Sequence, residues 1–203
     1  MKIALFGGTG RVGSRLLKEA VARGHQVTAF SRDISVVENL AGVTWRTGDL
    51  HLPEQLPALL SGHDVILTAV HFTDVPATTF LQLCRAARIP RLLSTGGAGS
   101  LLTNDGKRLM DSAEFPPHVI PEATAGARFL EILKQEKEID WVFLSPSMLI
   151  LPGERTGQFR LGTDNLLIDS NGKSHISMED FAVAMLDELE QPQHRSERFT
   201  VGY

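Results

Sequence analysis

Three glycines stand at intervals of three residues near the start of the chain, in the stretch FGGTGRVGSR. Gly7, Gly10 and Gly13 follow an apolar run, Lys2–Phe6, and precede a segment of helical period. Glycines in this context permit a tight turn, close approach of the backbone to a phosphate and tight packing of helix on strand. The stretch predicts a strand, a dinucleotide-binding loop and a helix in succession; a glycine-rich turn without a ligand is the alternative.

Short apolar runs alternate with helical segments along the rest of the chain. The expected strands are Lys2–Phe6, Gln26–Phe30, Thr44–Arg46, Asp64–Val70, Arg91–Ser94, Trp141–Leu144 and Phe199–Val201. The expected helices are Arg11–Arg23, a segment from Pro53 to Gly62, Ala77–Arg88, Glu122–Glu138 and Met178–Glu190. This alternation predicts an α/β protein with a doubly wound parallel sheet, the Rossmann fold, and helices on both faces.

Two stretches interrupt the alternation. Residues 96–121 show little periodicity and many Gly, Pro and Asp residues, so we expect a lid loop there. Residues 152–176 are expected to form a small antiparallel extension on the substrate side, with Asn171–Gly172 as its clearest turn. With 203 residues and no linker, the chain is expected to form a single domain, 1–203.

The charge and cysteine content exclude several classes of function. Lys and Arg number 20 against 24 Asp and Glu, which lacks the basic excess of a nucleic-acid-binding protein. One cysteine, Cys84, allows no internal disulfide, and the seven histidines do not fall at metal-ligand spacing, so no metal site is expected. Without a leader or an apolar span, the chain is expected to be cytoplasmic, a monomer or homodimer, with no membrane or nucleic-acid partner.

The spacing G-x-x-G-x-x-G resembles the short-chain dehydrogenase/reductase superfamily, especially its atypical members. GDL at 48–50, TAV at 68–70 and STGGAG at 94–99 fall where that family has further motifs, so the resemblance covers essentially the whole chain. It implies that Asp49 lies beside an adenine and that the end of the fourth strand lines a ribose. The expected cofactor-binding residues are Gly7, Thr9, Gly10, Arg11, Val12, Gly13, Arg32, Asp49, Leu50, Ala69, Val70, His71, Thr95 and Gly96.

The second strand ends in AFSRD, which bears on the cofactor. Enzymes that use NAD place an acid about 20 residues past the glycines to bind the ribose 2′-hydroxyl, whereas an Arg suits a 2′-phosphate. Arg32 occupies that position, and Asp33 is expected to cap the following segment. Arg11 can approach the same phosphate from the glycine loop. The pair favours NADP(H); two solvated surface arginines are the alternative.

The residues of the family's usual reaction are missing. Its reductases usually carry Tyr-x-x-x-Lys at the start of the fourth helix, where this chain reads FPPHVIPEATAGARFLE, and its one tyrosine is Tyr203, the last residue. That argues against tyrosine-dependent oxidation, epimerisation and dehydration. The chain length, GGTGRVG, GGAGSLL and RFTVGY are most similar to the NADH-flavin reductase-like and biliverdin reductase B-like group, which lacks the pair.

We therefore expect an NADPH-dependent oxidoreductase that passes hydride to a flavin, quinone or similar planar acceptor, with FMN or FAD as substrate rather than bound cofactor. The candidate proton donors are Ser147, after the sixth strand, and His118, in the lid loop; His71 is expected to contact cofactor or to do chemistry. A non-catalytic sensor of NADP(H) redox state is the alternative. An isomerase or dehydratase of nucleotide-linked sugars is a weaker third.

Overall fold

The computed structural model describes residues 1–35, 37, 40–113 and 115–203. Its strands are β1 (Lys2–Phe6), β2 (Gln26–Ser31), β3 (Val43–Thr47), β4 (Val65–Thr68), β5 (Arg91–Thr95), β6 (Asp140–Pro146), β7 (Leu149–Leu151), β8 (Arg160–Gly162), β9 (His175–Ser177) and β10 (Glu197–Gly202). Its α-helices are α1 (Arg11–Ala22), α2 (Pro57–Leu60), α3 (Ala77–Ala87), α4 (Ile120–Lys134) and α5 (Met178–Glu190). Short 3₁₀ turns cover Pro53–Gln55, Leu109–Asp111 and Pro117–Val119.

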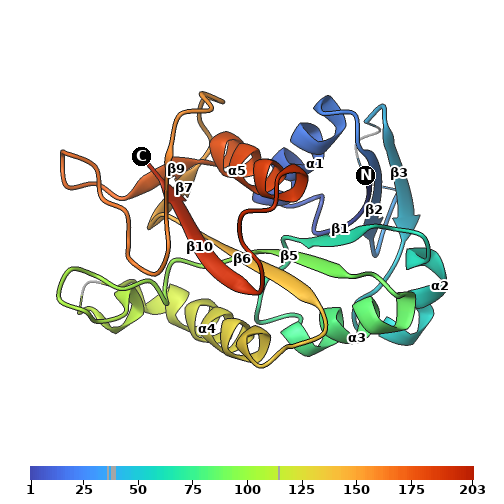
Figure 1. The fold of residues 1–203 in the computed structure, drawn as a ribbon, viewed down its shortest axis with the longest axis horizontal. Helices are drawn as coiled ribbons and strands as arrows, with labels where there is room; N and C mark the ends of the chain where they lie inside the picture. The colour runs from blue at the N-terminus through green and yellow to red at the C-terminus, as the bar shows by residue number, and fades with distance from the viewer. Residues whose placement is uncertain (36, 38–39, 114) are drawn as a thin grey trace.

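Eight strands form one sheet in the order β3-β2-β1-β4-β5-β6-β10-β8 (Figure 1). Seven of them run parallel, and β8 adds to the edge antiparallel to β10. The strand order reverses between β1 and β4, which in open α/β sheets creates a crevice beyond the carboxyl ends of the strands. The expected doubly wound parallel sheet is confirmed.

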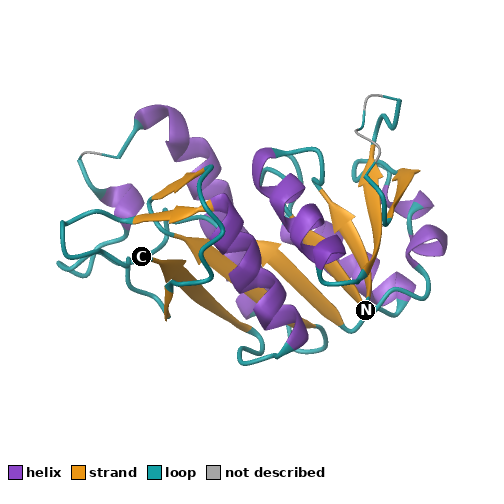
Figure 2. Ribbon diagram, turned by 90° about the horizontal axis from the view of Figure 1, so that it is seen from above, coloured by secondary structure: helices purple, strands orange, loops and turns teal. Residues whose placement is uncertain are grey.

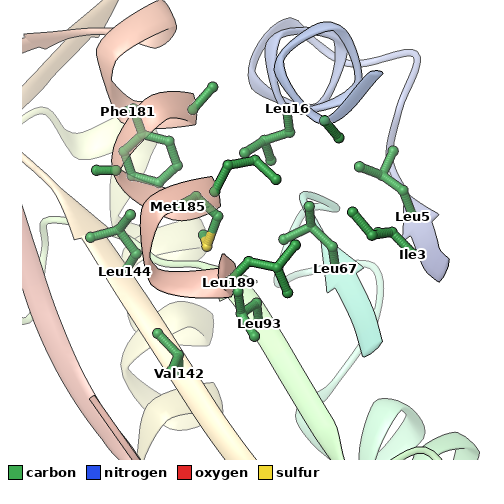
Figure 3. Close-up of a cluster of buried hydrophobic side chains, with 14 of the residues drawn as sticks. Ile3, Leu5, Leu16, Leu67, Leu93, Val142, Leu144, Phe181, Met185 and Leu189 are labelled. Carbon is green, nitrogen blue, oxygen red and sulfur yellow. The ribbon is translucent and has the colours of Figure 1, made fainter. Parts of the chain in front are cut away.

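Helices cover both faces of this sheet (Figures 1 and 2). One apolar cluster joins α1 and α5 to one face, and a second joins α2, α3 and α4 to the other. Figure 3 shows part of the first cluster, in which side chains of α1 and α5 meet those of the strands: Leu16, Phe181, Met185 and Leu189 against Leu67, Leu93 and Val142. Because both faces are covered, the central strands read as continuous apolar runs rather than alternating ones.

The lid region contains more structure than its composition predicts. It holds two of the 3₁₀ turns and the start of α4, and residue 114 of this stretch lies outside the described residues. Helix α4 ends at Lys134 instead of the expected Glu138. The cause is Glu136, whose carboxylate accepts backbone N–H groups of residues 137, 138 and 139 at 3.0, 2.7 and 3.1 Å and so closes a turn there.

The C-terminal extension differs from the expected set of antiparallel strands. Strands β7 and β9 pair in parallel in a separate two-stranded sheet, and β8 pairs with β10. The expected turn at Asn171–Gly172 forms. The Asp169 carboxylate closes it by accepting the N–H groups of Asn171 and Lys173, each at 2.8 Å. The chain then continues through β9 directly into α5, and β9 runs in the same direction as β7.

A buried carboxylate anchors both the extension and the C-terminal residue. Asp180, on α5, accepts hydrogen bonds from Thr156 N and Oγ1 at 2.8 and 2.5 Å, Gly157 N at 2.8 Å and Tyr203 Oη at 2.7 Å. Burial alone would raise the pKa of Asp180, but these hydrogen bonds outweigh it and hold the pKa below its usual value. The chain's one tyrosine is therefore part of a structural anchor.

Within the described residues, none of the helices combines the length and hydropathy that a membrane crossing requires.

Candidate functional site

A cavity of about 900 Å³ lies beyond the carboxyl ends of β1, β4, β5 and β6. Its walls come from the glycine loop, the segments that follow β4 and β5, the lid region and residues 146–150. A smaller pocket of about 180 Å³ adjoins it beyond β2 and β3, and the two share Gly7, Thr9, Arg32, Val70 and Asp74. The chain thus places one extended site at the position where doubly wound sheets bind ligands.

The glycine loop has the shape of a phosphate cradle. A Cβ on Gly7 would stand 2.6 Å from the Ala69 carbonyl oxygen, and one on Gly13 would stand 2.0 Å from the Gly7 carbonyl oxygen. A Cβ on Gly10 would meet only the Gly7 oxygen, at 3.2 Å. Gly7 and Gly13 therefore pack strand, loop and helix together, while Gly10 leaves the loop open where it lines the cavity.

The N-terminus of α1 is free to receive an anion. No side chain among the described residues caps this end, and the first turn of the helix contains no acid. The partial positive charge of a helix N-terminus then acts on whatever occupies the cavity beside it. An uncapped helix end behind an open glycine loop fits the pyrophosphate of a dinucleotide.

The smaller pocket combines the residues expected around the adenosine. Asp49 and Leu50 line it, and the Asp49 carboxylate accepts the His51 N–H at 2.9 Å. Arg32 is exposed at its edge, and none of the described acids forms an ion pair with Arg32 or with Arg11. Asp33 turns away toward Ser35, whose N–H and hydroxyl it accepts at 2.8 and 2.6 Å.

Thirteen of the fourteen expected cofactor-binding residues line one or both pockets. The fourteenth, Gly13, is buried behind the loop and acts through packing. The structure thus brings together segments that are far apart in the sequence. Their roles toward a cofactor stay predictions.

The structure places the two expected proton donors in different surroundings. Ser147 lines the cavity but is 0% exposed, and its hydroxyl donates to the Val201 carbonyl oxygen at 3.0 Å. His118 is exposed in the 3₁₀ turn before α4 and is not among the residues that line either pocket. The structure therefore leaves neither residue with a free proton donor inside the cavity.

Glu122, in the first turn of α4, is a cavity residue that the sequence did not single out. Its carboxylate accepts the N–H of Phe72 at 2.8 Å, the N–H and hydroxyl of Thr73 at 3.1 and 2.8 Å, and lies 3.3 Å from His71 Nδ1. Burial alone would raise the pKa of Glu122, but the hydrogen bonds outweigh it and hold the pKa below its usual value. An acidic residue is common in the first turn of a helix because it interacts favourably with the helix dipole. The sequence alone therefore did not indicate that Glu122 lines the cavity.

The half of the cavity away from the smaller pocket is mostly apolar. Its walls include Gly97, Ala98, Leu109, Phe115, Val119, Ala123, Met148, Leu149, Ile150 and Met178. Of the described residues at positions 96–178 that line it, Glu122 alone carries a charge. Walls of this kind favour the binding of apolar groups.

The chain matches known proteins over nearly its whole length. The model of a family described as NAD(P)H-binding matches residues 7–192. The uncharacterized protein YwnB of Bacillus subtilis is 38% identical over 208 residues, which cover 99% of this chain and 98% of YwnB.

Two solved structures share the fold. One, a candidate epimerase from Bacteroides thetaiotaomicron, is 42% identical with a TM-score of 0.90 and covers 100% of this chain and 96% of its own. The other, a candidate NADH-flavin reductase from Streptococcus pneumoniae, is 32% identical with a TM-score of 0.86 and covers 100% of this chain and 99% of its own.

These two relatives carry names for different reactions, although both share the fold from end to end. What they have in common with this chain is therefore the nucleotide-binding architecture, and the expected resemblance to NADH-flavin reductase-like proteins is confirmed. The shape of the glycine loop, the uncapped N-terminus of α1 and the family match all indicate nucleotide binding. This chain belongs to the NAD(P)H-binding family.

Proposed function

We propose that this protein is an NADPH-dependent reductase that transfers a hydride to a flavin, quinone or similar planar acceptor. The observation that carries the proposal is one continuous cavity, which joins the glycine loop and two arginines to an apolar chamber. Bound NADPH would supply the hydride. The chain's own residues hold the cofactor at one end and exclude water around the acceptor at the other.

The preference for NADPH rests on Arg11 and Arg32. Both side chains line the larger cavity, Arg32 also lines the smaller pocket, and neither is neutralised by a described acid. A guanidinium matches the geometry and charge of a 2′-phosphate. Asp33, the acid nearest in sequence to Arg32, is committed to Ser35 instead of the pocket.

A direct hydride transfer agrees with the residues that surround the chamber. A flavin or quinone ring accepts a hydride without a protein nucleophile, so positioning supplies most of the catalysis. Tyr203 is bound to Asp180 and does not line the cavity, which argues against the tyrosine-dependent chemistry of an epimerase. The apolar walls of the chamber favour an acceptor without a phosphate near the ring.

The test is turnover. Purified protein is mixed with NADPH and, in separate reactions, with a quinone, riboflavin, FMN and FAD, and the loss of nicotinamide absorbance is followed against a blank without protein. We expect the quinone and riboflavin to be reduced faster than FMN or FAD. Absence of oxidation above the blank with every planar acceptor would remove the proposal.

A second candidate function is a sensor of NADP(H) redox state. It is favoured by the placement of Ser147, whose hydroxyl is engaged, and of His118, which lies away from the cavity. Calorimetry separates the two functions. A sensor binds NADP and NADPH with different affinities and turns nothing over, whereas equal affinities would leave it without a signal.

A further inference from the structure

His71 and Glu122 form a pair at the wall of the cavity that joins two distant segments. His71 follows β4 and its side chain is 78% exposed, while Glu122 lies in the first turn of α4. The imidazole Nδ1 lies 3.3 Å from a Glu122 carboxylate oxygen. No described residue hydrogen-bonds Nε2 of His71, and the residue lines the cavity.

The Glu122 carboxylate is itself held in place. Three hydrogen bonds from Phe72 and Thr73 fix it against the segment that carries His71. One turn further along α4, a Cβ on Gly126 would stand 2.9 Å from the Phe72 ring, so the ring packs where a side chain at position 126 would be. The start of α4 and the segment after β4 therefore form one packed unit, which orients the histidine.

We propose that His71 donates the proton that completes reduction of the acceptor, and that Glu122 is its positioning residue. This inference rests on the proposed reductase function. A carboxylate beside Nδ1 keeps a proton on that nitrogen, so in the protonated ring Nε2–H is the group that acts as the acid. Exposure to solvent lets the imidazole take up a new proton after each turnover.

With a quinone as acceptor, the reaction adds one hydride and one proton. Bound NADPH would supply a hydride, which is the hydrogen together with the electron pair of its C–H bond, and would become NADP⁺; a quinone that accepts the hydride is reduced to a hydroquinone monoanion. The Nε2–H bond of the His71 imidazolium then breaks, and its proton bonds to the hydroquinone oxygen. The neutral imidazole regains a proton from water.

Few charged groups line the cavity around the histidine. The described titratable groups that line it besides His71 are Asp74 on the same segment, Glu122 on α4, Arg11 on α1 and Arg32 after β2. Glu122 is within hydrogen-bond reach of the imidazole. Asp74 contacts the backbone of His71 instead, since its N–H donates to the His71 carbonyl oxygen at 3.2 Å.

The experiment compares two planar acceptors in His71→Asn. Menadione needs a proton after the hydride, whereas methylene blue is a cation that becomes neutral on accepting a hydride and needs none. We expect the menadione rate of the variant to fall at least about tenfold more than its methylene blue rate, as loss of a general acid predicts. In the wild type the menadione rate divided by the methylene blue rate should decrease as pH rises, because a general acid loses its proton. In the variant this ratio should be independent of pH.

The matched control is His118→Asn, which removes an exposed imidazole outside the cavity and should leave the ratio unaltered. The role of Glu122 is read from the unliganded protein by NMR, since Glu122→Gln should reduce the share of the neutral His71 ring that carries its proton on Nδ1. A wild-type ratio in His71→Asn, or a shifted ratio in His118→Asn, overturns the proton transfer alone. An unchanged ratio of the two His71 tautomers in Glu122→Gln overturns the positioning role. Failure to turn over either acceptor overturns the reductase and the proton transfer together.

Discussion

Substitution of Arg32 by alanine should weaken binding of NADPH far more than binding of NADH. The side chain stands at the junction of the two pockets, directly after β2, where a 2′-phosphate would lie if the adenosine occupies the smaller pocket. NADH has a hydroxyl in place of that phosphate. The variant therefore removes a charge-assisted contact from one cofactor and little from the other.

The size of the effect follows from the exposure of Arg32. A hydrogen bond to a charged group contributes about 1.5–3 kcal/mol, and exposure to solvent and salt reduces the value toward the lower half of that range. A loss of about 2 kcal/mol corresponds to a roughly 30-fold rise in Kd for NADPH. We expect the Kd for NADH to change by less than about threefold, because no ionic contact is removed.

Isothermal titration calorimetry with both cofactors measures the difference. The control is Arg128→Ala, which removes the same charge from an exposed position on α4 that lines neither pocket. The wild-type preference for NADPH should also weaken as salt is added, and less so in Arg32→Ala. Equal losses for the two cofactors, or the same loss in Arg128→Ala, would refute the assignment of Arg32.

Three other predictions concern stability and reactivity. Gly13→Ala should lower the free energy of unfolding by about 2 kcal/mol or more, because its Cβ would stand 2.0 Å from the Gly7 oxygen. Gly10→Ala should lower the free energy of unfolding by less than about 1 kcal/mol, and thermal unfolding measures both effects. The lowered pKa of Asp180 predicts that wild-type stability falls as pH drops below about 4, with a flatter profile in Asp180→Asn, in denaturant titrations. Burial raises the pKa of the Cys84 thiol to about 12, so iodoacetamide should label it only after unfolding, as mass spectrometry will report.

Each of these three predictions has an outcome that would contradict it. Equal destabilisation by the two glycine variants would show that loop packing does not distinguish them. Parallel pH profiles for wild type and Asp180→Asn would assign the acid sensitivity to another carboxylate. Rapid labelling of Cys84 in the folded protein would show that its helix opens locally.

Much of the fold follows from local sequence patterns. The alternation of apolar runs and helical periods predicted the parallel sheet, because those patterns depend on residues within one element. The glycine loop was predictable for the same reason, since strand, turn and helix are contiguous between Lys2 and Ala22. The position of Arg32 at the end of β2 also follows from chain order alone.

The apolar half of the cavity and its polar groups depended on contacts between distant segments. Glu122 and His71 are 51 residues apart, and no local period relates them. Ser147 was expected as a donor, but a partner 54 residues away takes its hydroxyl, and the parallel pairing of β7 with β9 likewise depends on the path of the intervening chain. Contiguous motifs were enough to predict the nucleotide-binding architecture. Which polar groups remain free inside the cavity depends on burial and long-range hydrogen bonds, and these are properties of the packed chain that no local pattern encodes.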